Sequence, residues 1–468
     1  MFRLQSSTRS RYELAMTKPW WKEPTRAQWA AFAAAWVGWV LDAFDFTIYI
    51  CVAGSIIKEF GVSPTAVAGS LTLTLLVRLA GGICAGWIAD RWGRKLPLMM
   101  SLVWFAVFDA AIYFAPTFGW LLVLRTLFGF GMGAEWTAGT ALAMESFPPR
   151  GRRFASGLLQ AGWPVGFLLA ALTAYFVVPA FGWRAMFLIA AVPAVLVIPI
   201  RMLVPDEIAH AKTAAQSRGA LRDLAAPAVR KMLVLGSIVM ALGFVVYYGM
   251  TTSYMGLHLE LGMTPAQGWV DLIWFNVGML GGVIAAGWVA NRFGVIVALV
   301  APALLMVAAM PLFVGVAPGA MSIGAFLGGA LGVGYSGVTP VLTTSLFPEH
   351  VRARAIGIVY HVGAFVAAFV PSMIPWLAAN TGWHLSTVIV LVVGTALIAM
   401  SAAVLVLRGY IAPAEAPALA RIDTELPVAS APVLAGDLRA AARDMHPVAT
   451  AIVDREVAKA AERRAILG

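Results

Sequence analysis

Six charged side chains in the first half of the chain lie inside long apolar runs, where ionised groups are unusual. They are Asp42, Asp45, Arg78, Asp109, Arg125 and Glu135. Each residue of this kind costs about 2.5–3.5 kcal/mol at the centre of a membrane-spanning helix, so such residues must pair with one another or face a wet cavity. A carboxylate in that setting can take up a proton, and a guanidinium can hold a carboxylate through two parallel hydrogen bonds. The pattern therefore indicates a site for an anion and a proton.

The depth of each residue along its helix predicts which of these side chains meet. Asp42 and Asp45 are three residues apart and share a helix face near mid-membrane, and a descending second helix brings Arg78 to that level. We expect one cavity-facing cluster, made of Asp42, Asp45, Arg78, Arg125 and Glu135. Within it, Asp42, Asp45 and Glu135 are the candidates for proton coupling, with Asp45 and Glu135 preferred. An interhelical ion pair remains the alternative for Arg125, and we expect a structural role for Asp109.

The second half of the sequence offers almost no buried charge and supplies neutral hydrogen-bonding groups instead. Its candidate substrate-binding residues, beside Arg78 and Arg125, are His361, Tyr247, Tyr248 and Asn276. A single histidine inside a helix can also be a simple interhelical hydrogen-bonding residue, and the tyrosines can belong to an aromatic belt at the membrane surface. Both alternatives stay open at this point.

Composition decides the class of protein in which these residues sit. Hydrophobic residues make up 61% of the 468 residues and charged residues only 12%, which excludes a soluble enzyme. Apolar runs of about twenty residues indicate twelve membrane-spanning helices. The expected spans are 28–56, 67–89, 96–115, 119–144, 154–179, 184–204, 232–257, 268–290, 295–316, 320–345, 354–379 and 384–408. We expect an all-α membrane protein with the following parts: a cytoplasmic N-terminal segment (1–27), a six-helix half (28–204), a cytoplasmic linker (205–231), a second six-helix half (232–408) and a cytoplasmic tail (409–468).

The lysines and arginines predict the orientation of the chain. Only Lys58 and Arg184 fall in the odd-numbered gaps between spans, whereas the even-numbered gaps and both tails hold many basic residues. By the positive-inside rule, both termini are cytoplasmic. The net charge of +10 is spread over short loops, so we expect the lipid bilayer and no nucleic acid as a partner.

Two motifs recur at a nearly constant spacing along the chain. GWIADRWGR at 86–94 matches GWVANRFGV at 287–295, and ESFPPRGRRFASG at 145–157 matches SLFPEHVRARAIG at 345–357. Each motif occupies the same place in its set of six spans. This indicates a duplicated six-helix unit, with substrate bound between the halves near mid-membrane and transport by rocking of one half against the other.

The motif GWIADRWGRK at 86–95 resembles the loop between the second and third helices of the major facilitator superfamily. The resemblance covers about residues 28–408 and implies a conformational latch at the ends of helices. Its residues would be Gly86, Asp90, Arg91, Gly93, Arg94 and Lys95. A solvated turn that only fixes topology is the alternative. The second copy lacks the acid and the final basic pair, so we expect a weaker latch there.

Three shorter stretches are similar to the sialate:proton symporter branch, which includes lactate, pyruvate and sialic acid permeases. They are LDAFDF at 41–46, GFGMGAEWTAG at 129–139 and YHVGA at 360–364. Aromatic acid:proton symporters share a related acidic motif in helix one.

The resemblance implies a monomeric secondary transporter in a bacterial-type inner membrane that imports a small organic anion with a proton. A symporter of a neutral solute such as a sugar, a drug:proton antiporter, and a sensor or membrane enzyme are the alternatives. No phosphate loop or metal-ligand spacing occurs, so we expect no cofactor, no metal and no catalytic residue.

Overall fold

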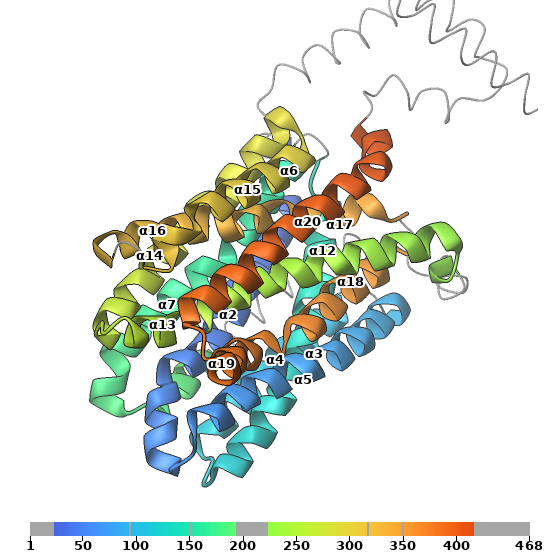
Figure 1. The fold of residues 1–468 in the computed structure, drawn as a ribbon. Helices are drawn as coiled ribbons and strands as arrows, with labels where there is room; N and C mark the ends of the chain where they lie inside the picture. Colours follow the sequence, from blue (N-terminus) through green and yellow to red (C-terminus); the bar gives the residue numbers. More distant parts are fainter. Residues whose placement is uncertain are drawn as a thin grey trace, which may run out of the picture. The chain divides into compact units, whose positions relative to one another are not determined.

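The computed structural model describes residues 23–92, 95–148, 151–192, 223–315, 318–348 and 351–415. Within these ranges all regular structure is helical (Figure 1). The predicted linker, 205–231, is described only from residue 223, and the predicted tail only to residue 415. The domain limits derived from the sequence therefore stay predictions.

The helices of the first half follow the predicted spans closely. They are α2 (Arg26–Phe60), α3 (Pro64–Trp92), α4 (Lys95–Tyr113), α5 (Phe118–Ser146), α6 (Arg152–Gln160) and α7 (Gly162–Phe181). Helices α6 and α7 run on as one long apolar segment. Residues 185–192 are also helical and begin the sixth predicted span, the rest of which lies outside the described residues.

The second half contains more interrupted helices than the first. Its elements are α12 (Pro227–Thr251), α13 (Tyr254–Glu260), α14 (Pro265–Phe293), α15 (Val295–Phe313), η2 (Pro318–Ala320), α16 (Met321–Leu327), η3 (Gly328–Val333), η4 (Gly334–Val338), α17 (Thr339–Leu346), α18 (Arg352–Ala367), α19 (Val370–Thr381) and α20 (Leu385–Glu415). Among the described helices, nine are long and apolar enough to cross a membrane. The predicted all-helical chain is confirmed.

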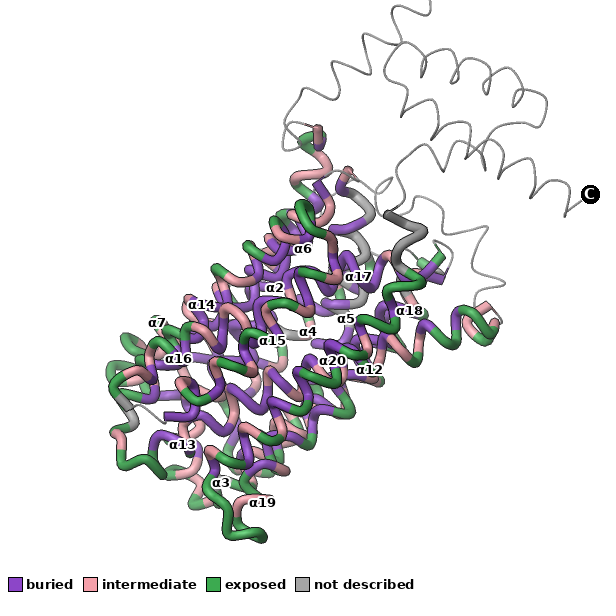
Figure 2. The backbone as a smooth tube through the Cα atoms, turned by 45° about the horizontal axis from the view of Figure 1, so that its top comes forward, coloured by how far each residue is buried: buried purple, intermediate pink, exposed green. Residues whose placement is uncertain are grey.

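The surface of these helices is rich in exposed apolar side chains. Phe114, Tyr175 and Phe181 are 73%, 75% and 77% exposed, respectively. Figure 2 shows buried and exposed stretches alternating along most helices, so one face of each helix packs and another faces outward. Exposed aromatic and aliphatic side chains of this kind suit contact with lipid, where the helix satisfies its own backbone groups.

Glycines allow close helix crossings in both halves at equivalent positions. A Cβ atom on Gly129 of α5 would lie 2.4 Å from the carbonyl oxygen of Thr74 in α3. In the second half, a Cβ on Gly329 of η3 would lie 1.8 Å from the carbonyl oxygen of Phe275 in α14. Small residues at such crossings let two backbones touch, which is the usual basis of helix packing in membranes. The sequence repeat thus reappears as a repeat of packing.

The second sequence motif also recurs as one local structure. Arg152 donates from Nη2 to the carbonyl oxygen of Phe147 at 3.0 Å, and Arg352 donates from Nε to that of Phe347 at 3.1 Å. Each arginine therefore satisfies a carbonyl at the C-terminal cap of the preceding helix, where intrahelical donors are missing. The motif closes the turn between two spans in the same way in each half.

The tenth predicted span is broken at its centre. Between α16 and α17, residues Gly328–Val333 form a π-helical turn and Gly334–Val338 a 3-10 turn. Irregular turns inside a helix often mark functional hinges. The glycine-rich stretch at 328–334 combines this irregular backbone with the close contact of Gly329 to α14.

We predict that Gly129→Ala destabilises the protein, whereas Gly54→Ala does not. The new methyl group of Gly129→Ala meets the Thr74 carbonyl, and overpacking of this kind costs about 1–3 kcal/mol. A Cβ on Gly54 of α2 has no atom within 4 Å, so Gly54→Ala keeps or slightly raises stability. Thermal unfolding of the two purified variants in the same detergent measures the difference. Equal melting temperatures would contradict the close crossing of α3 and α5.

Candidate functional site

A cavity of about 60 Å³ lies between helices of the two halves. It is lined by Trp39, Arg78, Gln160, Trp163, Val239, Met240, Gly243, Phe244, Tyr247, Tyr248, Met279, Val333, Tyr335, Ser336, Thr339 and Tyr360. Seven of these sixteen residues are aromatic, and one, Arg78, is charged. Apolar cavities with a few placed polar groups are typical sites for small molecules. Of the residues predicted to bind substrate, Arg78, Tyr247 and Tyr248 belong to this wall.

The aromatic wall is built by contacts that cross between the halves. Trp136 of α5 stacks on Tyr360 of α18, with ring centroids 4.3 Å apart and planes 24° apart. Trp163 of α7 donates from Nε1 to the Tyr247 hydroxyl of α12 at 2.7 Å. Trp39 of α2 packs on Trp136 and Trp163 at centroid distances of 4.6 and 4.9 Å. Flat π surfaces from both halves therefore border the same space.

Arg78 is the cation of this wall, and it is only 1% exposed. Its Nη2 lies 3.3 Å from Oδ2 of Asp42, and its guanidinium carbon lies 5.2 Å from the centre of the Tyr360 ring. Its Nε makes no hydrogen bond within the described part of the chain. The guanidinium thus has one carboxylate and one aromatic face as neighbours, and it keeps a free donor.

A second buried group of charges lies between α2, α4 and α5. Asp45 has Asp109 and Arg125 among its electrostatic neighbours, and all three side chains are fully buried. The Arg125 guanidinium lies over the rings of Tyr49 and Phe128, at 4.6 and 4.5 Å from their centroids. Its nitrogens make no hydrogen bond with the described residues. None of these three charged residues lines the cavity.

The structure therefore divides the predicted single cluster into two groups. Arg78 lines the cavity and pairs with Asp42, whereas Asp45, Asp109 and Arg125 form a group that does not line it. Asp109, for which we expected a structural role, is an electrostatic neighbour of the other two. Whether Asp109 faces Asp45 and Arg125 depends on the rotation of α4 about its own axis. The depth of a residue along its helix does not give this rotation.

His361 and Asn276 lie apart from the cavity wall. The His361 Nε2 donates to the Gly133 carbonyl oxygen of α5 at 2.9 Å, and the imidazole fills the space above Gly82, where a Cβ would lie 2.1 Å from Cδ2. His361 thus joins the two halves. Asn276 donates from Nδ2 to the Leu272 carbonyl of its own helix at 2.9 Å.

Several predicted residues lie outside the part of the structure that can be described. The side chains concerned are those of Glu135, Asp90, Arg91 and Lys95, together with all of Gly93 and Arg94. Gly86 is buried within α3. The roles assigned to these residues from sequence therefore stay predictions.

Contacts between the halves do occur near the other repeated motif. Arg153 of α6 donates from Nη1 to the Ala290 carbonyl, in the last turn of α14, at 3.1 Å. The Ser156 hydroxyl donates to the Gly337 carbonyl at 2.7 Å and accepts from the Val341 backbone N–H at 3.2 Å. A cation at the C-terminal end of a helix is favourably placed in the helix dipole. These contacts join α6 to α14 and to the broken tenth span.

The described part of the second half holds one buried acidic residue, which sequence reasoning missed. Asp271 of α14 is 2% exposed, and its Oδ2 lies 2.8 Å from Nε2 of the fully buried His258. The residue falls inside the predicted eighth span, so its position in the sequence was a usable signal. Among the described residues, no three His, Cys, Asp or Glu side chains gather in a way that could hold a metal ion.

Comparison with protein families adds independent information. The model of the Major Facilitator Superfamily matches residues 35–344. The cis,cis-muconate transport protein of Acinetobacter baylyi is 28% identical over 365 residues, which cover 75% of this chain and 87% of the relative. The niacin transporter NiaP of the same organism is 27% identical over 393 residues, covering 75% and 89%. The sialic acid transporter NanX of Escherichia coli is 26% identical over 396 residues, covering 82% and 95%.

Among solved structures, the proton:xylose symporter XylE bound to 6-bromo-6-deoxy-D-glucose is similar to this chain, with a TM-score of 0.69. The alignment covers 82% of this chain and 96% of that one, at 17% sequence identity. At this identity the likeness shows the fold alone. It confirms the all-α membrane fold of the major facilitator type that the sequence predicted.

We predict that Asp42 and Arg78 depend on each other for stability. Removal of one partner leaves an uncompensated buried charge, which costs about 3–5 kcal/mol, whereas removal of both leaves none. Asp42→Asn and Arg78→Gln should therefore each lower the melting temperature more than the double variant does. Glu59→Gln is the control, because its pair with Arg184 is partly exposed and worth about 1 kcal/mol or less. Additive losses in the double variant would contradict the pairing.

Proposed function

Because this chain belongs to the Major Facilitator Superfamily, we propose that it is a secondary transporter that imports a small organic carboxylate together with a proton. The observation that carries the proposal is the Arg78 guanidinium at the cavity wall, next to Asp42 and with a free donor. A carboxylate in the cavity can bind this guanidinium bidentately through charge-assisted hydrogen bonds, which are stronger than the hydrogen bonds that a neutral solute can accept. The muconate, niacin and sialic acid named for three relatives are themselves carboxylic acids.

The aromatic wall supports a flat, unsaturated carboxylate as the preferred substrate. Trp39, Trp163 and Tyr360 offer π faces around the space that Arg78 borders. A planar conjugated acid can stack on such faces while its carboxylate reaches the guanidinium. Substrate binding between rings from both halves would also draw the halves together, as alternating access requires.

The buried group behind the cavity supports coupling to a proton. Asp45 and Asp109 share one cation, Arg125. In a site of low dielectric constant, charge balance is reached with one carboxylate and one carboxylic acid, because two carboxylates against one guanidinium leave a net buried charge. The group can therefore carry one exchangeable proton. Glu135 is proposed as a further carrier from its place in the sequence.

The remaining parts of the proposal concern topology and gating. We place the protein as a monomer in a bacterial-type inner membrane with both termini in the cytoplasm, because of its basic loops. The motif at 86–95 and the contact of Arg153 with α14 are both proposed to hold the halves together on the cytoplasmic side. The two six-helix halves would then rock about the cavity.

We predict uptake of carboxylates that depends on the proton gradient. Cells that express the protein are given radiolabelled nicotinate, cis,cis-muconate, lactate or a hexose, with and without a protonophore. Nicotinate or muconate should accumulate by about tenfold or more over control cells, and the protonophore should abolish the accumulation. Hexose uptake without carboxylate uptake would reject the proposal in favour of a sugar symporter. Extrusion of hydrophobic cations would favour a drug antiporter.

We predict that Asp45→Asn and Glu135→Gln abolish proton-driven accumulation, and that at least one of them spares exchange of substrate down its gradient. Asp109→Asn should resemble Asp45→Asn, because either change leaves Arg125 with a single carboxylate that has no reason to take a proton. Accumulation and counterflow in proteoliposomes separate the two activities. Glu59→Gln, at a partly exposed carboxylate, should behave as wild type. Unchanged accumulation in both Asp45→Asn and Glu135→Gln would end this assignment of the proton site.

A further inference from the structure

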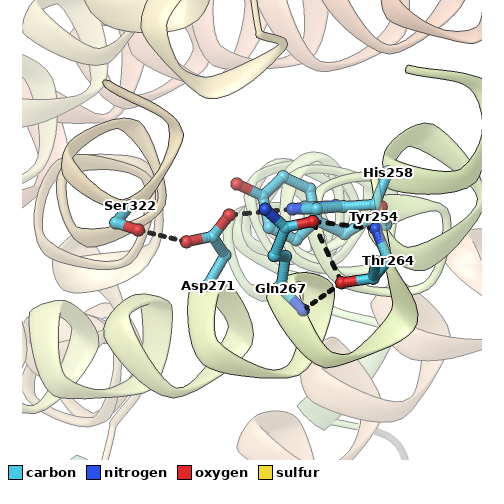
Figure 3. A network of polar contacts seen from close by, with 6 residues as sticks. All are labelled: Tyr254, His258, Thr264, Gln267, Asp271 and Ser322. Atoms are coloured by element: carbon cyan, nitrogen blue, oxygen red, sulfur yellow. Dashed lines mark hydrogen bonds and ion pairs between the residues drawn. The ribbon is translucent and has the colours of Figure 1, made fainter. Parts of the chain in front are cut away.

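A second buried pair of ionisable residues lies far along the chain from the first, at the turn between α13 and α14 (Figure 3). His258 of α13 is fully buried, and its Nε2 lies 2.8 Å from Oδ2 of Asp271 in α14. Its Nδ1 lies 2.8 Å from the carbonyl oxygen of Tyr254. The Ser322 hydroxyl of α16 donates to the other oxygen of Asp271. Three helices therefore meet at one carboxyl group.

The hydrogen bonds fix the number of protons that the pair holds. A carbonyl oxygen only accepts, so Nδ1 of His258 must carry a hydrogen. Nε2 and the Asp271 oxygen can then form their 2.8 Å contact only if a further proton lies between them, on one atom or the other. Without that proton, the lone pair of a neutral imidazole would face a buried carboxylate at hydrogen-bond distance, which is repulsive. For both contacts of the imidazole to be hydrogen bonds, the pair must hold two hydrogens, one more than a neutral imidazole beside a carboxylate provides.

The pair also holds a short helix in place. Helix α13 has only seven residues and is separated from α12 by a break at Thr252 and Ser253. Helix α12 carries Tyr247 and Tyr248 of the cavity wall close to that break. On the other side, the turn to α14 is closed by Thr264 and Gln267, which form a capping box at the start of α14. His258 is the buried attachment of α13 to α14.

The other ionisable groups around α13 are few and can be named. The Tyr254 ring packs on the imidazole with centroids 4.5 Å apart, and it stacks on Phe313 of α15. Glu260, at the C-terminal end of α13, accepts from the Leu385 backbone N–H and lies 2.9 Å from Nδ1 of His384. The His384 side chain is 83% exposed, so this contact is a solvated one. Helices α15 and α16 contain no ionisable side chain.

We propose that His258 and Asp271 form a second proton-binding site, separate from the carboxylates of the first half, and that the bound proton holds α13 against α14 and α16. Loss of one proton leaves a single ring hydrogen for two acceptor oxygens, so one of the two contacts of His258 becomes repulsive and the hold on α13 weakens. The predicted orientation puts this turn on the outer side of the membrane. Protons from the outer side of the membrane would thus control how firmly α13 is held. Helix α13 follows α12, which carries part of the cavity wall.

Hydrogen exchange of the wild-type protein in lipid nanodiscs tests this proposal without any substrate. The backbone amides of α13 are followed by mass spectrometry from about pH 6 to about pH 9, with rates corrected for intrinsic exchange. The protection of α13 should fall by about tenfold or more with rising pH, because a buried pair is being broken. The amides of α15, which has no ionisable side chain, should keep constant protection. Constant protection of α13 would overturn the proposal.

Two variants assign the effect to the buried pair. In Asp271→Asn, the amide can donate to Nε2 and accept from Ser322, so the contacts survive without a removable proton. The protection of α13 should then no longer depend on pH. His384→Gln is the matched control at the exposed pair, and it should keep the pH dependence of the wild type. If Asp271→Asn retains that dependence, or if His384→Gln removes it, the buried pair is not the proton site.

Discussion

The contact of Arg78 with Asp42 is the constraint around which the candidate site is organised. A buried guanidinium must have a counter-charge, and the carboxylate at 3.3 Å supplies one from the neighbouring helix α2. The Tyr360 ring from the other half adds a second favourable contact for the same cation. Arg78 therefore contacts residues of both halves. In the proposed function, an anion that enters the cavity competes with Asp42 for the guanidinium, and this competition links substrate binding to proton binding.

The helices can present these charges because glycines let them cross closely. Gly129 brings α5 against α3 beside the turn of α3 that leads to Arg78, and Gly329 brings the broken tenth span against α14. The two halves share this packing, but the residues that lie beside the helix crossing differ between them. In the first half the crossing lies among buried aspartates and arginines. In the second it lies beside an aromatic wall and a π-helical turn, so the duplicated scaffold carries two kinds of chemistry.

Sequence reasoning predicted the helices well, and the site only in part. The constant rise per residue of a helix predicted that Asp42 and Arg78 lie at a similar depth in the membrane. The contact of Asp109 with Asp45 depends on the rotation of α4 about its axis, which a nearly uniform apolar sequence does not fix. The aromatic wall was missed because 17 tryptophans and 10 tyrosines are spread over the whole chain and give no local signal. The position of His258 was missed because it depends on the break between α12 and α13. That break arises from packing, so the sequence pattern does not predict it.

The two buried groups that we propose as proton sites differ in a way that suggests different tasks. Asp45 and Asp109 share Arg125, so either can give up a proton while the cation remains as partner. His258 and Asp271 pair directly with each other, and in our proposal the loss of a proton weakens this contact between α13 and α14. The first arrangement permits repeated exchange without unfolding of its surroundings, as a transport cycle requires. The second couples proton binding to the position of a helix, which suits the control of access better than it suits turnover.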